Sequence, residues 1–78
     1  MNEIETAYKL FGEGESFFDF KFKMIQNGYF LDELKNDPEW RVRRAVAEQG
    51  YALDKLKNDS RWHVREAALD KLKELENE

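Results

Sequence analysis

Residues 28–48 read GYFLDELKNDPEWRVRRAVAE, and residues 50–70 read GYALDKLKNDSRWHVREAALD. Aligned without a gap, the two stretches have the same residue at 12 of 21 positions. Identity of this extent at a constant offset indicates an internal repeat, in which each copy is one supersecondary unit that buries its apolar face against the next. This repeat decides the fold, and the flanking segments are interpreted outward from it.

Each copy predicts two short helices with an aspartate between them. In the first copy, Leu31 and Leu34 lie on one side of a helix over residues 29–36. Asp37 is suited to cap the second helix, because its short side chain can accept a free backbone N–H. Pro38 would occupy the first position of that helix, where a missing N–H costs no hydrogen bond.

The second helix of each copy has an apolar face. Val42 and Val46 are four residues apart in the first copy, and Gly50 is placed to end that helix in a left-handed conformation. In the second copy the helix continues through Leu72 to a polar tail, as in the capping unit of a repeat protein. We expect the inward-facing apolar residues of both copies to form the core: Leu31, Leu34, Val42, Val46, Leu53, Leu56, Val64, Ala68 and Leu72.

The N-terminal third of the chain matches the repeat only in outline. We interpret it as two helices, over residues 2–11 and 16–27, with Ser16 as the cap of the second. The alternative is a β-hairpin within residues 6–24, because large apolar residues there also alternate with polar ones. An isolated two-stranded hairpin is only marginally stable, so we prefer the helical interpretation.

The composition excludes several classes of protein. The chain has no cysteine and a single histidine, His63, so disulfides and iron–sulfur clusters are excluded and an ordinary zinc site lacks ligands. No glycine-rich phosphate-binding motif occurs, and no nucleophile lies near the histidine in the sequence. The net charge of −4 differs from the basic footprint of most nucleic-acid-binding domains. We expect no catalytic residue, no metal and no cofactor.

The stretch DPEWRVR at residues 37–43, echoed by DSRWHVR at residues 59–65, resembles the signature of HEAT repeats. The short period and the leucines before the aspartate also resemble the leucine-rich repeat variant. The resemblance implies an all-α, right-handed stack of about three short helical hairpins, an α-solenoid fragment of bacterial or phage type. The hairpins would be residues 1–27, residues 28–49, and residues 50–78 with an extended capping helix.

The same resemblance implies structural roles for two aspartates and two arginines. In the family, the aspartate of the signature and the arginine six residues later form a ladder of charges between neighbouring repeats. This carries over to Asp37 with Arg43 and to Asp59 with Arg65. We predict that Arg43 and Asp59 lie within ion-pair distance and link successive copies. HEAT proteins are mostly scaffolds for other macromolecules, and one branch comprises DNA glycosylases.

The residues around the two tryptophans are the candidates for binding a partner. Arg41 and His63 occupy equivalent positions and should project from one face. Tryptophan and arginine are enriched among the residues that dominate interface energies. The candidate partner-binding residues are Trp40, Arg41, Arg44, Arg61, Trp62 and His63. Taken alone, the tryptophans are more simply explained by packing between the copies and the charges by solvation of the surface, and a binding role for them is the alternative.

We therefore expect a non-enzymatic protein–protein interaction module, a small regulator or inhibitor that masks the surface of a partner protein. Lack of cysteine, of a membrane-length apolar run and of a signal peptide favours a cytoplasmic monomer or weak homodimer away from membranes. One alternative is a nucleic-acid-binding repeat that uses a basic strip of Arg41, Arg44, Arg61, His63 and Arg65. The other is a structural repeat domain that self-associates through its open end.

Overall fold

The computed structural model describes residues 2–77, and within this range the protein is all-helical. Helices take up 67% of it, and no described residue belongs to a strand. The six helices in chain order are α1 (Glu3–Phe11), α2 (Phe17–Gln26), α3 (Leu31–Leu34), α4 (Trp40–Glu48), α5 (Leu53–Leu56) and α6 (Trp62–Glu76). The predicted helical class is confirmed, and the β-hairpin alternative for residues 6–24 is wrong.

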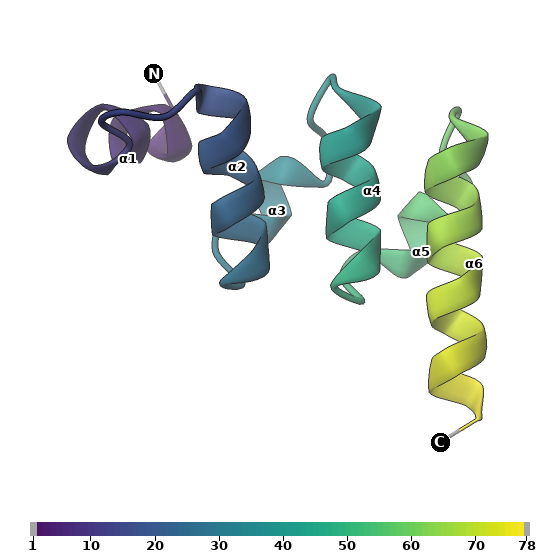
Figure 1. The fold of residues 1–78 in the computed structure, drawn as a ribbon. Helices are drawn as coiled ribbons and strands as arrows, with labels where there is room; N and C mark the ends of the chain where they lie inside the picture. Colours follow the sequence, from purple (N-terminus) through teal and green to yellow (C-terminus); the bar gives the residue numbers. More distant parts are fainter. Residues whose placement is uncertain (1, 78) are drawn as a thin grey trace.

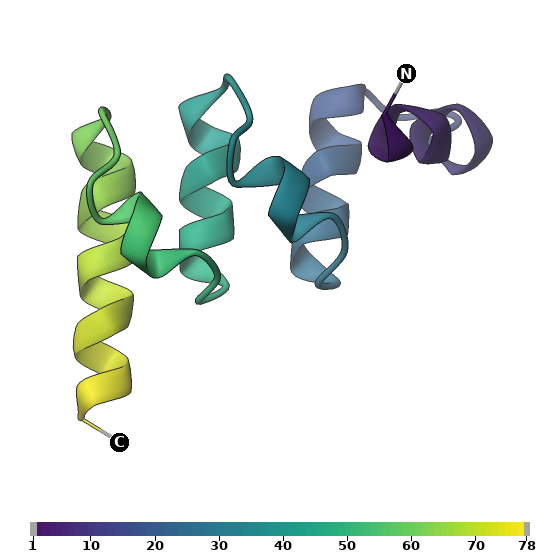
Figure 2. The same ribbon diagram turned by 180° about the vertical axis from the view of Figure 1, so that it is seen from behind.

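Three of the helices form a row. Helices α2, α4 and α6 lie side by side, and the single-turn helices α3 and α5 lie together on one side of that row (Figures 1 and 2). Helix α6 packs against α4 and α5, and α4 packs against α2 and α3. Helix α1 lies beyond α2, at the end of the row opposite α6 (Figure 1). Helix α4 is therefore the inner member of the row, and α6 is an outer one.

Side-chain caps define where α1 and α2 begin. The Oδ1 atom of Asn2 accepts a hydrogen bond from the Glu5 N–H at 2.9 Å, and the Oγ atom of Ser16 accepts one from the Asp19 N–H at 3.0 Å. These bonds satisfy backbone donors that have no partner within their own helix. The predicted cap at Ser16 is confirmed.

The second helix of each copy begins later than predicted. Helix α4 begins at Trp40 with Glu39 as its N-cap, so the expectation that Asp37 caps this helix is wrong. The Asp37 carboxylate instead accepts the N–H of Glu39 at 2.9 Å, which forms an Asx turn just before the helix. The Asp59 carboxylate accepts the N–H of Arg61 in the same way, also at 2.9 Å. The turn therefore fixes the direction of each carboxylate.

The first helix of each copy is a single turn, shorter than the predicted span of residues 29–36. Phe30 and Ala52, at equivalent positions just before α3 and α5, have left-handed backbones with φ of 60° and 56°. A left-handed residue cannot belong to a right-handed helix, so neither helix can begin earlier. Gly28 and Gly50 follow α2 and α4 with φ of 80° and 82°, which confirms the predicted left-handed glycine after α4.

Buried apolar residues from all six helices form the core. Seven of the predicted core residues are buried: Leu34, Val42, Val46, Leu53, Leu56, Val64 and Ala68. Leu31 and Leu72 are only partly buried and pack against the edge of the core. The sequence pattern missed four buried residues: Ile4, Phe20, Ile25 and Ala47. Three of these come from the N-terminal third, where the repeat pattern is weakest.

Aromatic contacts attach α1 to α2. The ring of Tyr8 on α1 lies 4.9 Å from that of Phe17 and 5.4 Å from that of Phe20, measured between centroids. Phe20 is 1% exposed, whereas Phe18 is 38% exposed and packs edge-on against Phe22 at 4.8 Å. The phenylalanines of α2 are thus divided between core and surface, and α1 covers the end of the row beyond α2 (Figure 1).

Candidate binding surface

Two ion pairs connect successive helices of the row. Arg43 on α4 reaches the carboxylate of Asp59 in the turn before α6, with Nε 2.8 Å from Oδ2 and Nη2 3.0 Å from Oδ1. Lys21 on α2 reaches Asp37 in the turn before α4, with Nζ 2.6 Å from Oδ2. Lys21 precedes Arg43 by the 22-residue offset of the repeat, as Asp37 precedes Asp59. The predicted Arg43–Asp59 ion pair is confirmed, and the same link recurs with the period of the repeat.

Within one copy, arginine and aspartate are joined through the backbone. The Nη1 atom of Arg43 donates to the carbonyl oxygen of Asp37, and Nη1 of Arg65 donates to that of Asp59, both at 2.8 Å. The carboxylates of the two aspartates point to the preceding helix instead. Each aspartate therefore joins two helices of the row. Its backbone carbonyl binds the arginine of the helix that follows it, and its carboxylate binds a basic residue of the previous helix in the row.

The Arg43–Asp59 pair is shielded from solvent, since the two side chains are 14% and 5% exposed. Burial raises the pKa of the Asp59 carboxyl, but hydrogen bonds from the Arg43 side chain and the Arg61 N–H outweigh burial and leave that pKa below its ordinary value. The hydrogen bond to Asp59 raises the pKa of Arg43 against the opposing effect of desolvation. Bidentate pairing of this kind is strong and directional, so it fixes α4 relative to the turn before α6.

Arg65 on α6 is the counterpart of Arg43, but it makes only the contact to a backbone carbonyl and not the contact to a carboxylate. It keeps the hydrogen bond to the carbonyl of Asp59, yet no carboxylate within residues 2–77 forms an ion pair with it. Its side chain lines a recess formed by α6 residues and Lys57, to which no residue of α4 contributes; we call this the outer side of α6. The ladder that the resemblance implies thus has a vacant position at Arg65.

His63 lies between the two tryptophans. Its ring is stacked on Trp40 with centroids 4.4 Å apart and on Trp62 with centroids 3.8 Å apart. The guanidinium carbons of Arg41 and Arg61 lie 4.7 Å and 4.9 Å from the centroid of Trp40, which is the geometry of a cation–π contact. These five residues come from α4, α6 and the turn before α6, and we call them the aromatic–arginine surface.

The two tryptophans have different environments although they are equivalent in the repeat. Trp40 is partly buried because it packs on His63 of the next copy. Trp62 stacks on the other face of the same imidazole and is 55% exposed. The Nδ1 atom of His63 is buried without a hydrogen-bond partner in the described chain, since the indoles cover the ring. Packing between the copies therefore accounts for Trp40 and leaves Trp62 open.

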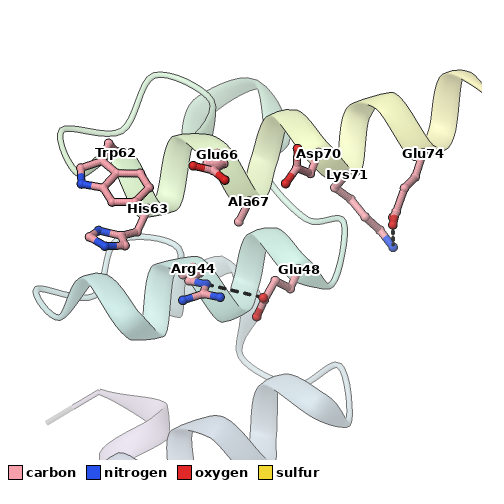
Figure 3. Close-up of a pocket in the computed structure, with 9 residues that line it drawn as sticks. All are labelled: Arg44, Glu48, Trp62, His63, Glu66, Ala67, Asp70, Lys71 and Glu74. Atoms are coloured by element: carbon pink, nitrogen blue, oxygen red, sulfur yellow. Dashed lines mark ion pairs between the residues drawn. The ribbon is translucent and has the colours of Figure 1, made fainter.

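An open groove of about 450 Å³ begins at the aromatic–arginine surface and follows α4 and α6. Its lining residues are Arg44, Glu48, Trp62, His63, Glu66, Ala67, Asp70, Lys71 and Glu74 (Figure 3). Arg44 pairs with Glu48 at 3.5 Å, and Lys71 pairs with Glu74 at 3.3 Å. The lining has four carboxylates and only two ammonium or guanidinium groups, so the groove is acidic beyond the tryptophan.

The structure brings together five of the six candidate partner-binding residues, and Arg44 lies next to them in the groove. Of the five basic residues of the nucleic-acid alternative, four lie close to the tryptophan stack and Arg65 lies apart from them. Arg41 and Arg44 line a recess beside α2, His63 lies in the tryptophan stack, and Arg65 lies on the outer side of α6. Arg41 also pairs with Glu39 at 3.0 Å.

The sequence interpretation missed one ion pair, that between Lys21 and Asp37. The Lys21–Asp37 ion pair could have been found, because a shift by 22 residues places Lys21 in register with Arg43.

Among residues 2–77, no group of three or more histidine or carboxylate side chains is arranged to hold a metal ion. None of the described helices is long and apolar enough to cross a membrane.

The chain was compared with known protein families, with characterised proteins and with solved structures, and none of the three comparisons found a match.

Proposed function

We propose that this chain is a non-enzymatic interaction module that binds another protein through the aromatic–arginine surface. The same proposal describes the fold as a HEAT-like, right-handed stack of three short hairpins, namely residues 1–27, 28–49 and 50–78. In this proposal the module is a small regulator or inhibitor that masks part of its partner. The single observation that carries the proposal is the imidazole sandwiched between two tryptophans, of which Trp62 is largely exposed and Trp40 is in contact with two arginines.

The repeated ion pairs support the stack. Lys21–Asp37 and Arg43–Asp59 occur at the same positions of successive units, and each joins one helix of the row to the turn before the next. Helices α2, α4 and α6 run side by side, with α3 and α5 on one side (Figure 2). An arrangement in which every unit contacts only its neighbours is characteristic of repeat proteins, which present equivalent residues on one surface.

The stack of aromatic rings is preorganised for binding. Trp40 and His63 hold Trp62 in place from one side, so a partner that covers Trp62 would restrict few additional side-chain rotations. Tryptophan and arginine are the residues most often found to dominate the energy of protein interfaces. The stack offers a partner the exposed ring of Trp62, while the guanidinium groups of Arg41 and Arg61 lie against Trp40 at the other end of the stack.

The charges around this surface favour a protein over a nucleic acid as the partner. Glu66 and Asp70 lie on the groove side of α6 without an ion-pair partner within residues 2–77 (Figure 3). They would repel phosphate groups and attract a lysine or arginine of a protein. The arginines lie at one end of the groove and the carboxylates farther along it, which suits a partner segment of mixed charge.

The test is a charge-reversal variant with a matched control. Immobilised protein captures its partner from a cell lysate, and the captured protein is identified by mass spectrometry and purified. Binding of that protein is then measured for Arg41→Glu/Arg61→Glu. We expect affinity to fall by about tenfold or more, as for loss of hot-spot residues. The control is Lys9→Glu/Lys55→Glu, which makes the same change of charge at exposed residues away from the surface.

The outcome separates this surface from general electrostatics. Equal loss in both double variants would show that net charge, and not the aromatic–arginine surface, determines binding. Undiminished binding by Arg41→Glu/Arg61→Glu, with an unchanged far-ultraviolet spectrum, would contradict the proposal. Retention of nucleic acid with an affinity that falls steeply with salt would favour the nucleic-acid alternative instead.

A further inference from the structure

The outer side of α6 carries residues equivalent to those with which α4 meets the next unit. Under the 22-residue offset of the repeat, Arg65 is equivalent to Arg43 and Leu69 is equivalent to Ala47. Arg43 is paired with Asp59, and Ala47 is 0% exposed. Leu69 is 48% exposed, and Arg65 has no ion pair within residues 2–77. The same set of positions is therefore covered on α4 and open on α6.

The open positions lie on one face of α6, and Leu72, which is partly buried at the edge of the core, continues that face. Trp62, Arg65, Leu69 and Leu72 are spaced by three or four residues, which places them on one face of the helix. They line a recess whose other lining residues come from α6 and from Lys57 after α5, with none from α4. The capping helix of a repeat protein normally presents a polar outer face. Here that face contains an exposed indole and an exposed leucine beside an arginine whose counterpart binds a carboxylate.

The opposite end of the row is closed. Helix α1 lies beyond α2 (Figure 1), and Tyr8 on α1 packs against Phe17 and Phe20 of α2. At the position equivalent to Asp59, the closed end has Glu15, whose carboxylate is already bound to Lys23 at 2.6 Å. A second copy of the chain therefore cannot stack head to tail on α6 without displacing its own α1. We therefore expect a different molecule, and not a second copy stacked head to tail, to bind the outer face of α6.

We infer that the outer face of α6 is a docking site for a helical segment of another protein that carries an aspartate or glutamate in the turn just before a helix. The carboxylate binds Arg65, in the way Asp59 binds Arg43, and the apolar side of the following helix covers Trp62 and Leu69. The inference goes beyond the proposed function, because it is carried by Arg65 and Leu69, which do not line the groove. Trp62, Glu66 and Asp70 border both the groove and this recess.

The test uses the chain's own α5–α6 segment as the probe, because this segment is what covers the equivalent face of α4. A synthetic peptide of residues 51–76 is titrated into the isotope-labelled full-length protein, and the indole signals are followed by nuclear magnetic resonance. We expect the Trp62 signal to shift more than the Trp40 signal. Arg65→Ala in the protein, or Asp59→Asn in the peptide, should each weaken binding about tenfold or more, since a charge-assisted hydrogen bond is lost.

A covalently extended variant provides a second test, because the synthetic peptide alone can fail to fold. A duplicate of residues 50–71 is inserted after Lys71, which places a second aspartate turn opposite Arg65. We expect the urea midpoint of unfolding to rise above that of the parent, and the rise to shrink when the inserted aspartate is replaced by asparagine. If the peptide fails to bind, the extended variant is the deciding test. A higher urea midpoint than that of the parent supports the docking site, and an unchanged or lower midpoint overturns it.

Two further outcomes would overturn the inference. One is peptide binding that Arg65→Ala leaves unchanged, since the peptide would then bind elsewhere. The other is self-association of the full-length protein that Arg65→Ala abolishes in sedimentation equilibrium, since the occupant of the face would then be a second copy.

Discussion

The inner face of α4 and the outer face of α6 are built from equivalent residues, and they differ in what covers them. On α4, Arg43 binds a carboxylate and Ala47 is fully buried; on α6, Arg65 has only a backbone partner and Leu69 is half exposed. The difference shows that a repeated sequence specifies the direction of a side chain, whereas the position of the unit in the row decides its surroundings. Each prediction below tests this contrast.

The largest expected effect separates two leucines of the second copy. Leu56 on α5 is 0% exposed, and Leu69 on α6 is 48% exposed. We expect Leu56→Ala to lower the free energy of unfolding by about 2–5 kcal/mol, because it leaves a cavity, in a domain whose total stability is on the order of 5 kcal/mol. Leu69→Ala is the matched control and should change it by about 0.5 kcal/mol or less. Urea unfolding followed by circular dichroism measures both, and equal effects would show that the faces are wrongly assigned.

A smaller effect concerns the acid dependence of the inner junction. The pKa of Asp59 is lowered in the folded protein, so its contribution to stability is fully present above the unfolded pKa of about 3.9 and is lost as the pH falls through the lower folded value. The stability difference between the wild type and Asp59→Asn should therefore shrink as the pH falls from 5 to 3.

Urea unfolding at several pH values checks the acid dependence. Asp70→Asn is a suitable reference, because Asp70 is exposed and forms no ion pair within residues 2–77. A wild type and an Asp59→Asn variant that lose stability in parallel between pH 5 and pH 3 would contradict the role assigned to the Arg43–Asp59 pair.

The smallest effect is expected in the groove. Arg44 and Glu48 are four residues apart on α4, with side chains 48% and 55% exposed and 3.5 Å between the charged atoms. An exposed pair of this kind contributes about 0.5 kcal/mol or less, because water and salt screen it. We expect Arg44→Ala to leave the urea midpoint nearly unchanged. A loss of more than about 1 kcal/mol, beyond the range of surface pairs, would mean that the groove belongs to the structural core.

The repeat in the sequence predicted much of this fold, and the exceptions have physical reasons. The helical class, the left-handed Gly50 and the Arg43–Asp59 pair follow from spacing and register. Asp37 was misassigned as a helix cap, because an aspartate that closes an Asx turn and one that caps a helix are the same residue in the same sequence context. The left-handed backbone at Phe30 left no sequence signal, since such residues are usually glycine or asparagine.

The candidate surface was only partly predictable. Equivalent positions brought Arg41 and His63 to one face, but the repeat alone cannot tell that Trp40 is covered by the next copy while Trp62 is open. That difference depends on which unit stands at the end of the row. The sequence likewise showed Lys21 in register with Arg43, but a degenerate first unit obscured its pairing with Asp37.

The contrast between the two faces is tested most directly by the same substitution at two equivalent residues. Arg43→Ala and Arg65→Ala each remove one guanidinium hydrogen bond to a backbone carbonyl, at 2.8 Å in both cases. Only Arg43→Ala also leaves a shielded carboxylate, that of Asp59, without its partner. We expect Arg43→Ala to lower the free energy of unfolding by about 1–3 kcal/mol more than Arg65→Ala does, because a buried charged group left unpaired is costly. Equal losses in urea unfolding would contradict the account, since the inner and outer faces would then be held by the same contacts.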